Sequence, residues 1–120
     1  MEKTILELEK SLFKYEYMSN KDYLKDIIDD KYEELGKSGK KFYKCDVIDE
    51  LNSLKTDRNI AIYNYTCEEI CKSLWLVHYI TLNNGVKIYR TSIWKRTENI
   101  IKIIFHQASE YKDYVDLTRF

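Results

Sequence analysis

The hydrophobic period of the chain changes once, near Lys55, and this change limits the folds that the chain can adopt. Before it, apolar residues recur at three- and four-residue spacing, which is typical of amphipathic helices. After it, four segments rich in Ile, Val, Tyr and Thr are typical of strands. Helices followed by an antiparallel meander predict an α+β domain in which the helices cover one face of a sheet.

The helical part predicts three helices. The second begins at Ser19, an N-cap residue that is followed three positions later by Asp22. A short KYEEL strand containing Glu34 stands between the second and third helices. The chain has no proline, repeat or linker, so we expect one domain. The predicted ranges are about 3–29 and 44–55 for the helices, about 31–36 and 59–110 for the sheet, and 1–120 for the domain.

Composition and charge argue against several classes of function. The 20 basic and 20 acidic residues give no net charge, so there is no basic surface that indicates nucleic-acid binding. No apolar run reaches the roughly 20 residues that a membrane span needs, and the N-terminus lacks a secretory segment, so we expect a cytoplasmic protein without membrane association. The three cysteines lack zinc spacing, and no P-loop or dinucleotide loop is present, so we expect no metal and no cofactor.

Two predicted turns fix the register of the last three strands. The Asn-Gly dipeptide at positions 84 and 85 is the strongest hairpin signal in the chain, because both residues tolerate positive φ. The Glu-Asn dipeptide at positions 98 and 99 is a weaker signal of the same kind. Two-residue loops at these positions place Tyr79 opposite Arg90, and Arg90 opposite Gln107.

This register predicts two sheet faces with different side chains. The first face holds Trp75, Val77, Tyr79, Trp94, Ser92, Arg90, Ile103, Phe105 and Gln107. The second face holds Leu76, His78, Ile80, Ile93, Thr91, Tyr89, Ile104, His106 and Ala108. The first face is bulkier, so we expect the helices to cover it, with His106 on the opposite side of the sheet from Gln107. Because a monomer rarely exposes a large apolar patch, the second face predicts a homodimer packed sheet to sheet.

The polar residues of the first face gather in a row formed by Tyr79, Arg90 and Gln107, with Ser92 one step inward. A guanidinium beneath helices is costly unless it is paired. Arg90 therefore needs either a carboxylate, for which Glu34 is the candidate, or an anionic or polar ligand. The sequence leaves both alternatives open.

The segments RTSIWKR and IIKIIFHQ resemble a strand–turn–strand pattern of the DUF4440 group in the NTF2-like superfamily, which includes SnoaL-like and ketosteroid isomerase-like proteins. The segment EELGKSG and the following KCDVIDEL are similar to that group's E-F-G-x-S-G and its next helix, and LELEKSL fits its opening helix. The likeness runs from about Ile5 to Tyr111. It departs from the usual pattern at Leu35, where Phe is common, and at positions 100–101, where Gly-Trp is common.

The resemblance implies a cone-shaped NTF2-like (cystatin-like) fold, with three N-terminal helices on a curved, mostly antiparallel sheet, a pocket between them, and frequent dimerisation. The positions that match recurring polar and aromatic positions of the group are Glu34, Arg90, Ser92, Trp94, His106 and Gln107. Proton-transfer enzymes of this superfamily place a carboxylate deep in the cone, facing a donor that stabilises an oxyanion.

Three functions remain open from the sequence. The first is binding of a small, largely apolar molecule in the cone, with Tyr79, Arg90, Ser92, Trp94 and Gln107 as the ligand-binding residues. The second is an isomerase, dehydratase or cyclase in which Glu34 is the base and Arg90, Tyr79 or His106 polarises a carbonyl group. The third is a protein-interaction or accessory module with a filled cone. A purely structural interpretation, with Glu34 paired to Arg90 and His106 satisfied within the sheet or interface, stands beside all three.

Overall fold

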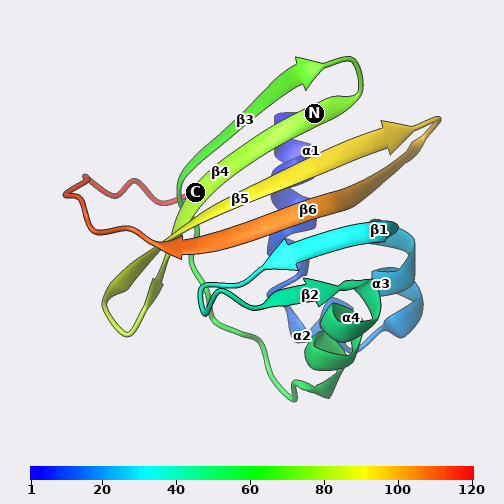
Figure 1. Ribbon diagram of the computed structural model, residues 1–120, viewed down its shortest axis with the longest axis horizontal. Helices are drawn as coiled ribbons and strands as arrows, with labels where there is room; N and C mark the ends of the chain where they lie inside the picture. Colours follow the sequence, from blue (N-terminus) through cyan, green and yellow to red (C-terminus); the bar gives the residue numbers. More distant parts are fainter.

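The computed structural model describes residues 1–120 and contains four helices and one six-stranded sheet (Figure 1). In chain order the elements are α1 (Glu2–Ser11), α2 (Tyr15–Met18), α3 (Lys21–Ile27), β1 (Ile28–Leu35), β2 (Lys41–Tyr43), α4 (Lys44–Ser53), β3 (Tyr63–Cys71), β4 (Leu74–Asn83), β5 (Val86–Thr97) and β6 (Ile100–Glu110). The strand order is β2-β1-β6-β5-β4-β3, and only the β1–β6 pair is parallel.

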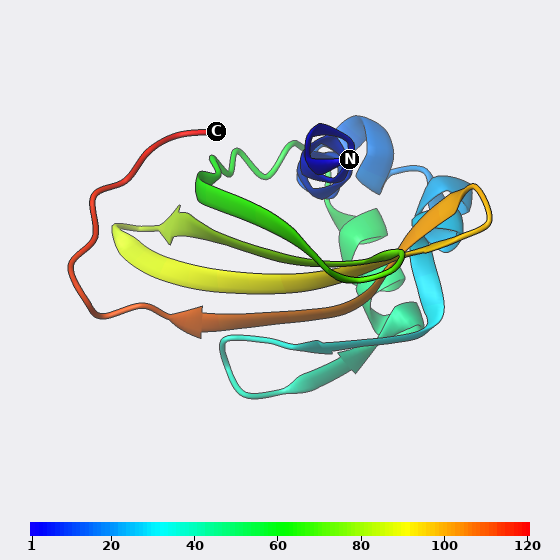
Figure 2. The same cartoon turned by 90° about the horizontal axis from the view of Figure 1, so that it is seen from above.

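The helices lie on one side of the curved sheet, as Figure 2 shows for α1. The core between the two layers joins Ile5 of α1, Leu24 of α3 and Leu51 of α4 to Val77 and Trp94 of the sheet. Trp94 has no exposed surface, which identifies the predicted first face as the covered one. We call this the inner face and the opposite side the outer face. The predicted α+β class is confirmed.

Helix ends differ from the predictions in ways that local hydrogen bonds explain. The cap of α3 is Asn20, whose Oδ1 accepts a hydrogen bond from the Tyr23 backbone N–H at 3.1 Å, so the prediction of Ser19 was wrong by one residue. Strand β1 begins at Ile28, directly after α3. Strand β2 was not predicted, because its three residues are too few to show a period of two.

The first predicted hairpin is confirmed. Asn84 and Gly85 have φ values of 52° and 83°, and Asn83 pairs with Val86. Tyr79 lies directly opposite Arg90, so these two polar side chains share the inner face.

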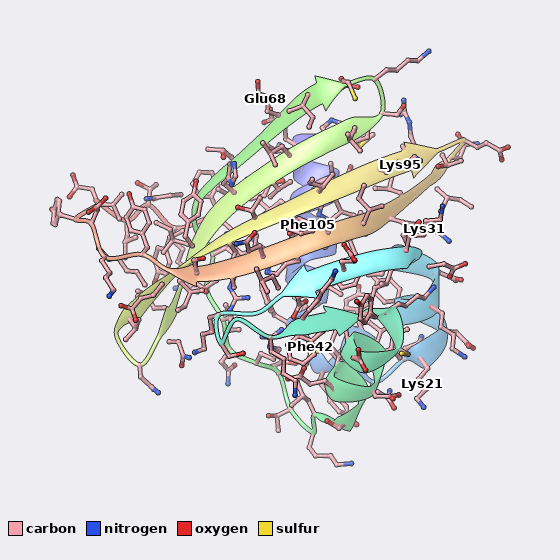
Figure 3. All side chains as sticks on the ribbon, in the orientation of Figure 1. Lys21, Lys31, Phe42, Glu68, Lys95 and Phe105 are labelled. Carbon is pink, nitrogen blue, oxygen red and sulfur yellow. The ribbon has the colours of Figure 1, made fainter.

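The second hairpin begins in the predicted register and then departs from it at a β-bulge. Between the Ile93–Phe105 and Trp94–Ile103 pairs, β6 contains the extra residue Ile104. One extra residue moves every later side chain of the strand to the other face. Phe105 therefore lies on the outer face, where Figure 3 shows it on the side of the sheet turned away from α1.

The bulge exchanges the predicted positions of His106 and Gln107. His106 pairs with Ser92 on the inner face, and Gln107 pairs with Thr91 on the outer face. The prediction that Gln107 lies in a row with Arg90, and that His106 lies on the opposite side, was wrong. Arg90 instead faces Ala108 across the strand pair.

None of the helices combines the length and the apolar character required to cross a lipid bilayer.

Candidate functional site

A cavity of about 580 Å³ lies between the helices and the inner face of the sheet. Half of its lining residues are hydrophobic, among them Phe13, Ile28, Val47, Leu51, Ile60 and Ile103. The charged lining residues are Glu9, Glu34, Lys37, Glu50, Arg58 and Arg90, and the neutral polar ones include Tyr32, Tyr79, Thr81 and His106. The cavity can therefore hold a small molecule with both apolar and polar parts.

Glu9 is a buried carboxylate in the cavity wall, with only 1% of its surface exposed. The Tyr79 hydroxyl donates to its Oε1 and the Trp94 indole N–H donates to its Oε2, both at 2.8 Å. The Ser92 hydroxyl also hydrogen-bonds to this carboxylate. Burial raises the pKa of Glu9, while the three hydrogen bonds and the Arg90 charge act in the opposite direction.

His106 connects the Ser92 hydroxyl to Arg90. Its Nδ1 lies 2.7 Å from Ser92 Oγ, and its Nε2 lies 3.4 Å from an Arg90 terminal nitrogen. A guanidinium can only donate, so Nε2 is the acceptor and the proton of the neutral ring resides on Nδ1. Burial and then the charges of Arg90 and Arg58 lower the pKa of His106 to about 3. The imidazole is therefore neutral at physiological pH.

Two guanidinium groups face the cavity without a carboxylate partner. Arg90 Nε donates to Thr81 Oγ1 at 2.8 Å. Arg58 comes from the segment between α4 and β3, and its guanidinium carbon lies 4.9 Å from the centre of the Phe13 ring. The ion pairs within 4.0 Å are Lys41–Glu33, Lys44–Asp30 and Lys112–Glu110, none of which includes either arginine.

The predicted ion pair between Glu34 and Arg90 is not formed. Glu34 Oε1 accepts a hydrogen bond from the Tyr32 hydroxyl at 2.6 Å. Glu34 lies opposite His106 in the β1–β6 pair, so it reaches the cavity from the neighbouring strand. The carboxylate that contacts the inner-face polar residues is Glu9, on the first helix.

The structure brings some of the predicted site residues together and separates others. Tyr79, Arg90, Glu34 and His106 all line the cavity. Ser92 and Trp94 have no exposed surface and lie behind the wall, where both contact Glu9. Gln107 lies on the outer face, away from the cavity.

Sequence reasoning missed Glu9 and Arg58. Glu9 follows Ile5 by four residues, which places it on the buried stripe of α1, and an acidic residue at a stripe position was the available signal. Arg58 stands in an irregular segment, where no period indicates the direction of a side chain. Its backbone N–H donates to the Phe13 carbonyl at 2.9 Å, which attaches this segment to the end of α1.

No group of three or more His, Cys, Asp and Glu side chains in the chain has the arrangement of a metal site. Cys45, Cys67 and Cys71 are free thiols.

Comparisons with known proteins agree with the architecture and give no assigned role. No protein-family model matches the chain, and a search of curated proteins finds no match. Among solved structures, an NTF2-like protein from Cytophaga hutchinsonii is similar with a TM-score of 0.73 at 19% identity, over 91% of this chain and 97% of that one. A DUF3225-family protein of unknown function from Pectobacterium atrosepticum gives a TM-score of 0.71 at 13% identity, over 91% and 86%.

A third similar structure is the CamKII hub homology domain of Chlamydamonas reinhardtii, with a TM-score of 0.69 at 14% identity, over 91% of this chain and 96% of that one. Identities this low establish the fold alone. Together with the helices packed on a curved, mostly antiparallel sheet, they show that the chain has the NTF2-like, cystatin-like fold.

Proposed function

We propose that the chain binds a small, largely apolar molecule that carries an anionic group, such as a carboxylate, in the cavity between the helices and the sheet. The observation that carries this proposal is the pair Arg58 and Arg90, which face one cavity without a carboxylate within ion-pair distance. The apolar walls suit the body of such a molecule, and the two guanidinium groups suit its charged end.

Electrostatics supports an anion at this position. Arg58 and Arg90 are both partly buried. A partly buried guanidinium without an ion-pair partner has lost part of its hydration, and a carboxylate at hydrogen-bonding distance restores that lost interaction. Burial lowers the pKa of Arg58, and the neighbouring Arg90 charge lowers it further, as expected for two cations close together. A bound carboxylate reduces the repulsion between the two groups.

We expect 2-naphthoate to bind and the uncharged 2-naphthalenemethanol to bind more weakly. Replacing Arg90 or Arg58 with Gln weakens 2-naphthoate binding by about 10- to 100-fold, because a charge-assisted hydrogen bond contributes about 1.5–3 kcal/mol. Isothermal titration calorimetry measures both ligands against each variant.

The matched control is Arg96→Gln, because Arg96 lies 5.7 Å from the centre of the Trp75 ring and outside the cavity lining. Its affinity for 2-naphthoate stays at the wild-type value. Equal binding of the acid and the alcohol, or an equal loss in all three variants, contradicts the proposal.

The alternatives receive different support. An open cavity favours a ligand site over a filled cone. An isomerase-type reaction with Glu34 as base and Tyr79 as donor is less favoured, because the Tyr79 hydroxyl already donates to Glu9. The segments RTSIWKR and IIKIIFHQ support a place in the DUF4440, SnoaL-like group, which we also propose.

We also propose that a second copy of the chain covers the outer face of the sheet. Leu76, Ile93 and Phe105 are only partly buried there, and together they form an apolar surface on neighbouring strands. Multi-angle light scattering at micromolar concentration then gives a dimer mass, and Phe105→Asp gives a monomer. Tyr114→Asp is the control, since Tyr114 is 85% exposed in the C-terminal segment. A monomer mass for the wild-type protein contradicts this proposal.

A further inference from the structure

A continuous chain of hydrogen bonds joins the proposed anion site to the buried Glu9 carboxylate. Arg90 reaches His106 Nε2 at 3.4 Å, His106 Nδ1 lies 2.7 Å from Ser92 Oγ, and Ser92 hydrogen-bonds to Glu9. Ser92 is fully buried and His106 is 8% exposed, so water has little access to the middle of this chain. The first member, Arg90, lines the cavity.

The donors of this chain all point in one direction. Arg90 donates to Nε2, so His106 carries its proton on Nδ1 and donates to Ser92 Oγ. The Ser92 hydroxyl proton is then free to donate to the Glu9 carboxylate, which also accepts from Tyr79 and Trp94. This direction requires an ionised Glu9 at the far end.

We propose that this series of hydrogen bonds is a proton relay. Binding of an anion beside Arg90 reverses the donor-to-acceptor direction of the relay, while Glu9 takes up one proton. This inference rests on the proposed function, since it concerns the same cavity and the same class of ligand. It means that the protein binds an organic anion and a proton together.

The reversal is balanced in protons. An oxygen of the bound carboxylate accepts a hydrogen bond from His106 Nε2–H in place of the bond that Nε2 accepted from Arg90. A proton from solvent bonds to Nε2, the Nδ1 proton moves to Ser92 Oγ, and the Ser92 hydroxyl proton moves to Glu9. Afterwards Glu9 donates to Ser92, and Ser92 donates to Nδ1. The two hydrogen bonds from His106 through Ser92 to Glu9 are kept, with donor and acceptor exchanged, and the bond from Arg90 to Nε2 is replaced by one from Nε2 to the ligand.

The charges of the cavity explain why a proton accompanies the anion. The charged lining residues are three acids and three bases, namely Glu9, Glu34, Glu50, Lys37, Arg58 and Arg90. These charges balance, so a bound monoanion leaves one excess negative charge close to the buried Glu9 and His106 side chains. Protonation of one carboxylate restores the balance.

Glu9 is the member of this set that is best placed to take the proton. Its burial already raises its pKa, and an added anion favours the neutral carboxyl further. The groups that face His106 are Arg90 from β5, Arg58 from the segment after α4, Glu34 and Tyr32 from β1, Tyr79 from β4, and Glu9 from α1 through Ser92. Burial, and then the charges of the two guanidinium groups, lower the pKa of His106, so the ring does not keep the extra proton but passes it on.

Calorimetry of 2-naphthoate in phosphate and in Tris, which differ in their heat of ionisation, measures the number of protons taken up on binding. We expect binding to take up as much as one proton per anion wherever Glu9 of the free protein is ionised, and affinity to rise there by up to about tenfold per unit fall in pH. Glu9→Gln keeps one acceptor oxygen for the Tyr79 and Trp94 donors, and its amide takes up no proton. We expect this variant still to bind 2-naphthoate, without proton uptake. Binding without proton uptake in the wild type, or equal uptake in Glu9→Gln, overturns the inference.

A second measurement uses the protein without any substitution in the relay. His78 and His106 are the only histidines, so isotope-labelled histidine gives two ring systems by NMR, and His78→Gln assigns them. We expect His106 to change from the Nδ1–H tautomer to the Nε2–H tautomer when 2-naphthoate is added. Binding without this change overturns the relay and leaves the proposed function intact. A failure of 2-naphthoate to bind contradicts the proposed function, and the inference with it.

Discussion

Replacing Glu9 with Ala lowers the free energy of unfolding by about 3 kcal/mol at neutral pH, because two buried donors lose their acceptor. The Tyr79 hydroxyl and the Trp94 indole N–H each donate to Glu9, and both residues are almost completely buried. An unsatisfied buried donor costs about 1–3 kcal/mol. The substitution also removes the free-energy cost of burying the carboxylate, which offsets part of this loss. The expected decrease in stability is therefore below the sum for two unsatisfied donors.

Urea denaturation measures this loss, with two variants as controls. Glu9→Gln retains an acceptor oxygen and loses less stability than Glu9→Ala. Glu7→Ala removes an exposed glutamate from the same helix and changes stability by less than about 0.5 kcal/mol. Equal effects of Glu9→Ala and Glu7→Ala would show that the buried hydrogen bonds contribute nothing to stability.

Acid destabilises the protein through His106 by as much as about 4 kcal/mol between pH 6.5 and pH 3. The pKa of His106 falls from 6.5 to about 3 on folding, so within this interval the unfolded chain binds a proton that the folded protein does not. The contribution of the neutral ring is fully present above pH 6.5 and is lost as the pH falls. Glu9, whose pKa is raised, has the opposite effect, since its contribution decreases as the pH rises above its ordinary range.

A comparison of variants separates the His106 contribution from all other groups. Denaturation curves from about pH 7 to pH 3 give the stability of the wild type, His106→Gln and His78→Gln. We expect the difference between the wild type and His106→Gln to shrink by several kcal/mol over this interval, while His78→Gln follows the wild type. Parallel curves for the wild type and His106→Gln would mean that His106 titrates in the same way in the folded and unfolded chains.

The sequence predicted the parts of the fold that depend on local chemistry. The Asn84–Gly85 turn has positive φ at both residues, which gave the correct Tyr79–Arg90 pair. The change of hydrophobic period near Lys55 gave the correct order of helices and sheet. In each case the backbone preference of a few neighbouring residues decides the outcome.

The β-bulge at Ile104 could not be predicted in the same way, because β-branched and aromatic residues fill both faces of β6. Neither register leaves a charged side chain in the core, so the residues on either side do not exclude the extra residue. The error reversed the roles of His106 and Gln107. The one histidine that belongs to the site was therefore assigned to the wrong face.

The candidate site was predicted in part, and its electrostatics were not. Arg90 was correctly placed on the inner face, but its expected partner Glu34 hydrogen-bonds to Tyr32 instead. Glu9 is 85 residues distant in sequence from Trp94, which donates to it, and Arg58 depends on the path of an irregular segment. Contacts of this kind are set by tertiary packing, which short-range patterns do not contain.

A crystal structure of the protein with 2-naphthoate would show directly whether the two arginines bind an anion in the cavity. We expect the carboxylate to lie between the Arg58 and Arg90 guanidinium groups, within hydrogen-bonding distance of both and of His106 Nε2. The ring system is expected against the apolar wall at Phe13 and Leu51. A naphthoate with its carboxylate in solvent at the cavity mouth, or bound outside the cavity, would contradict this expectation.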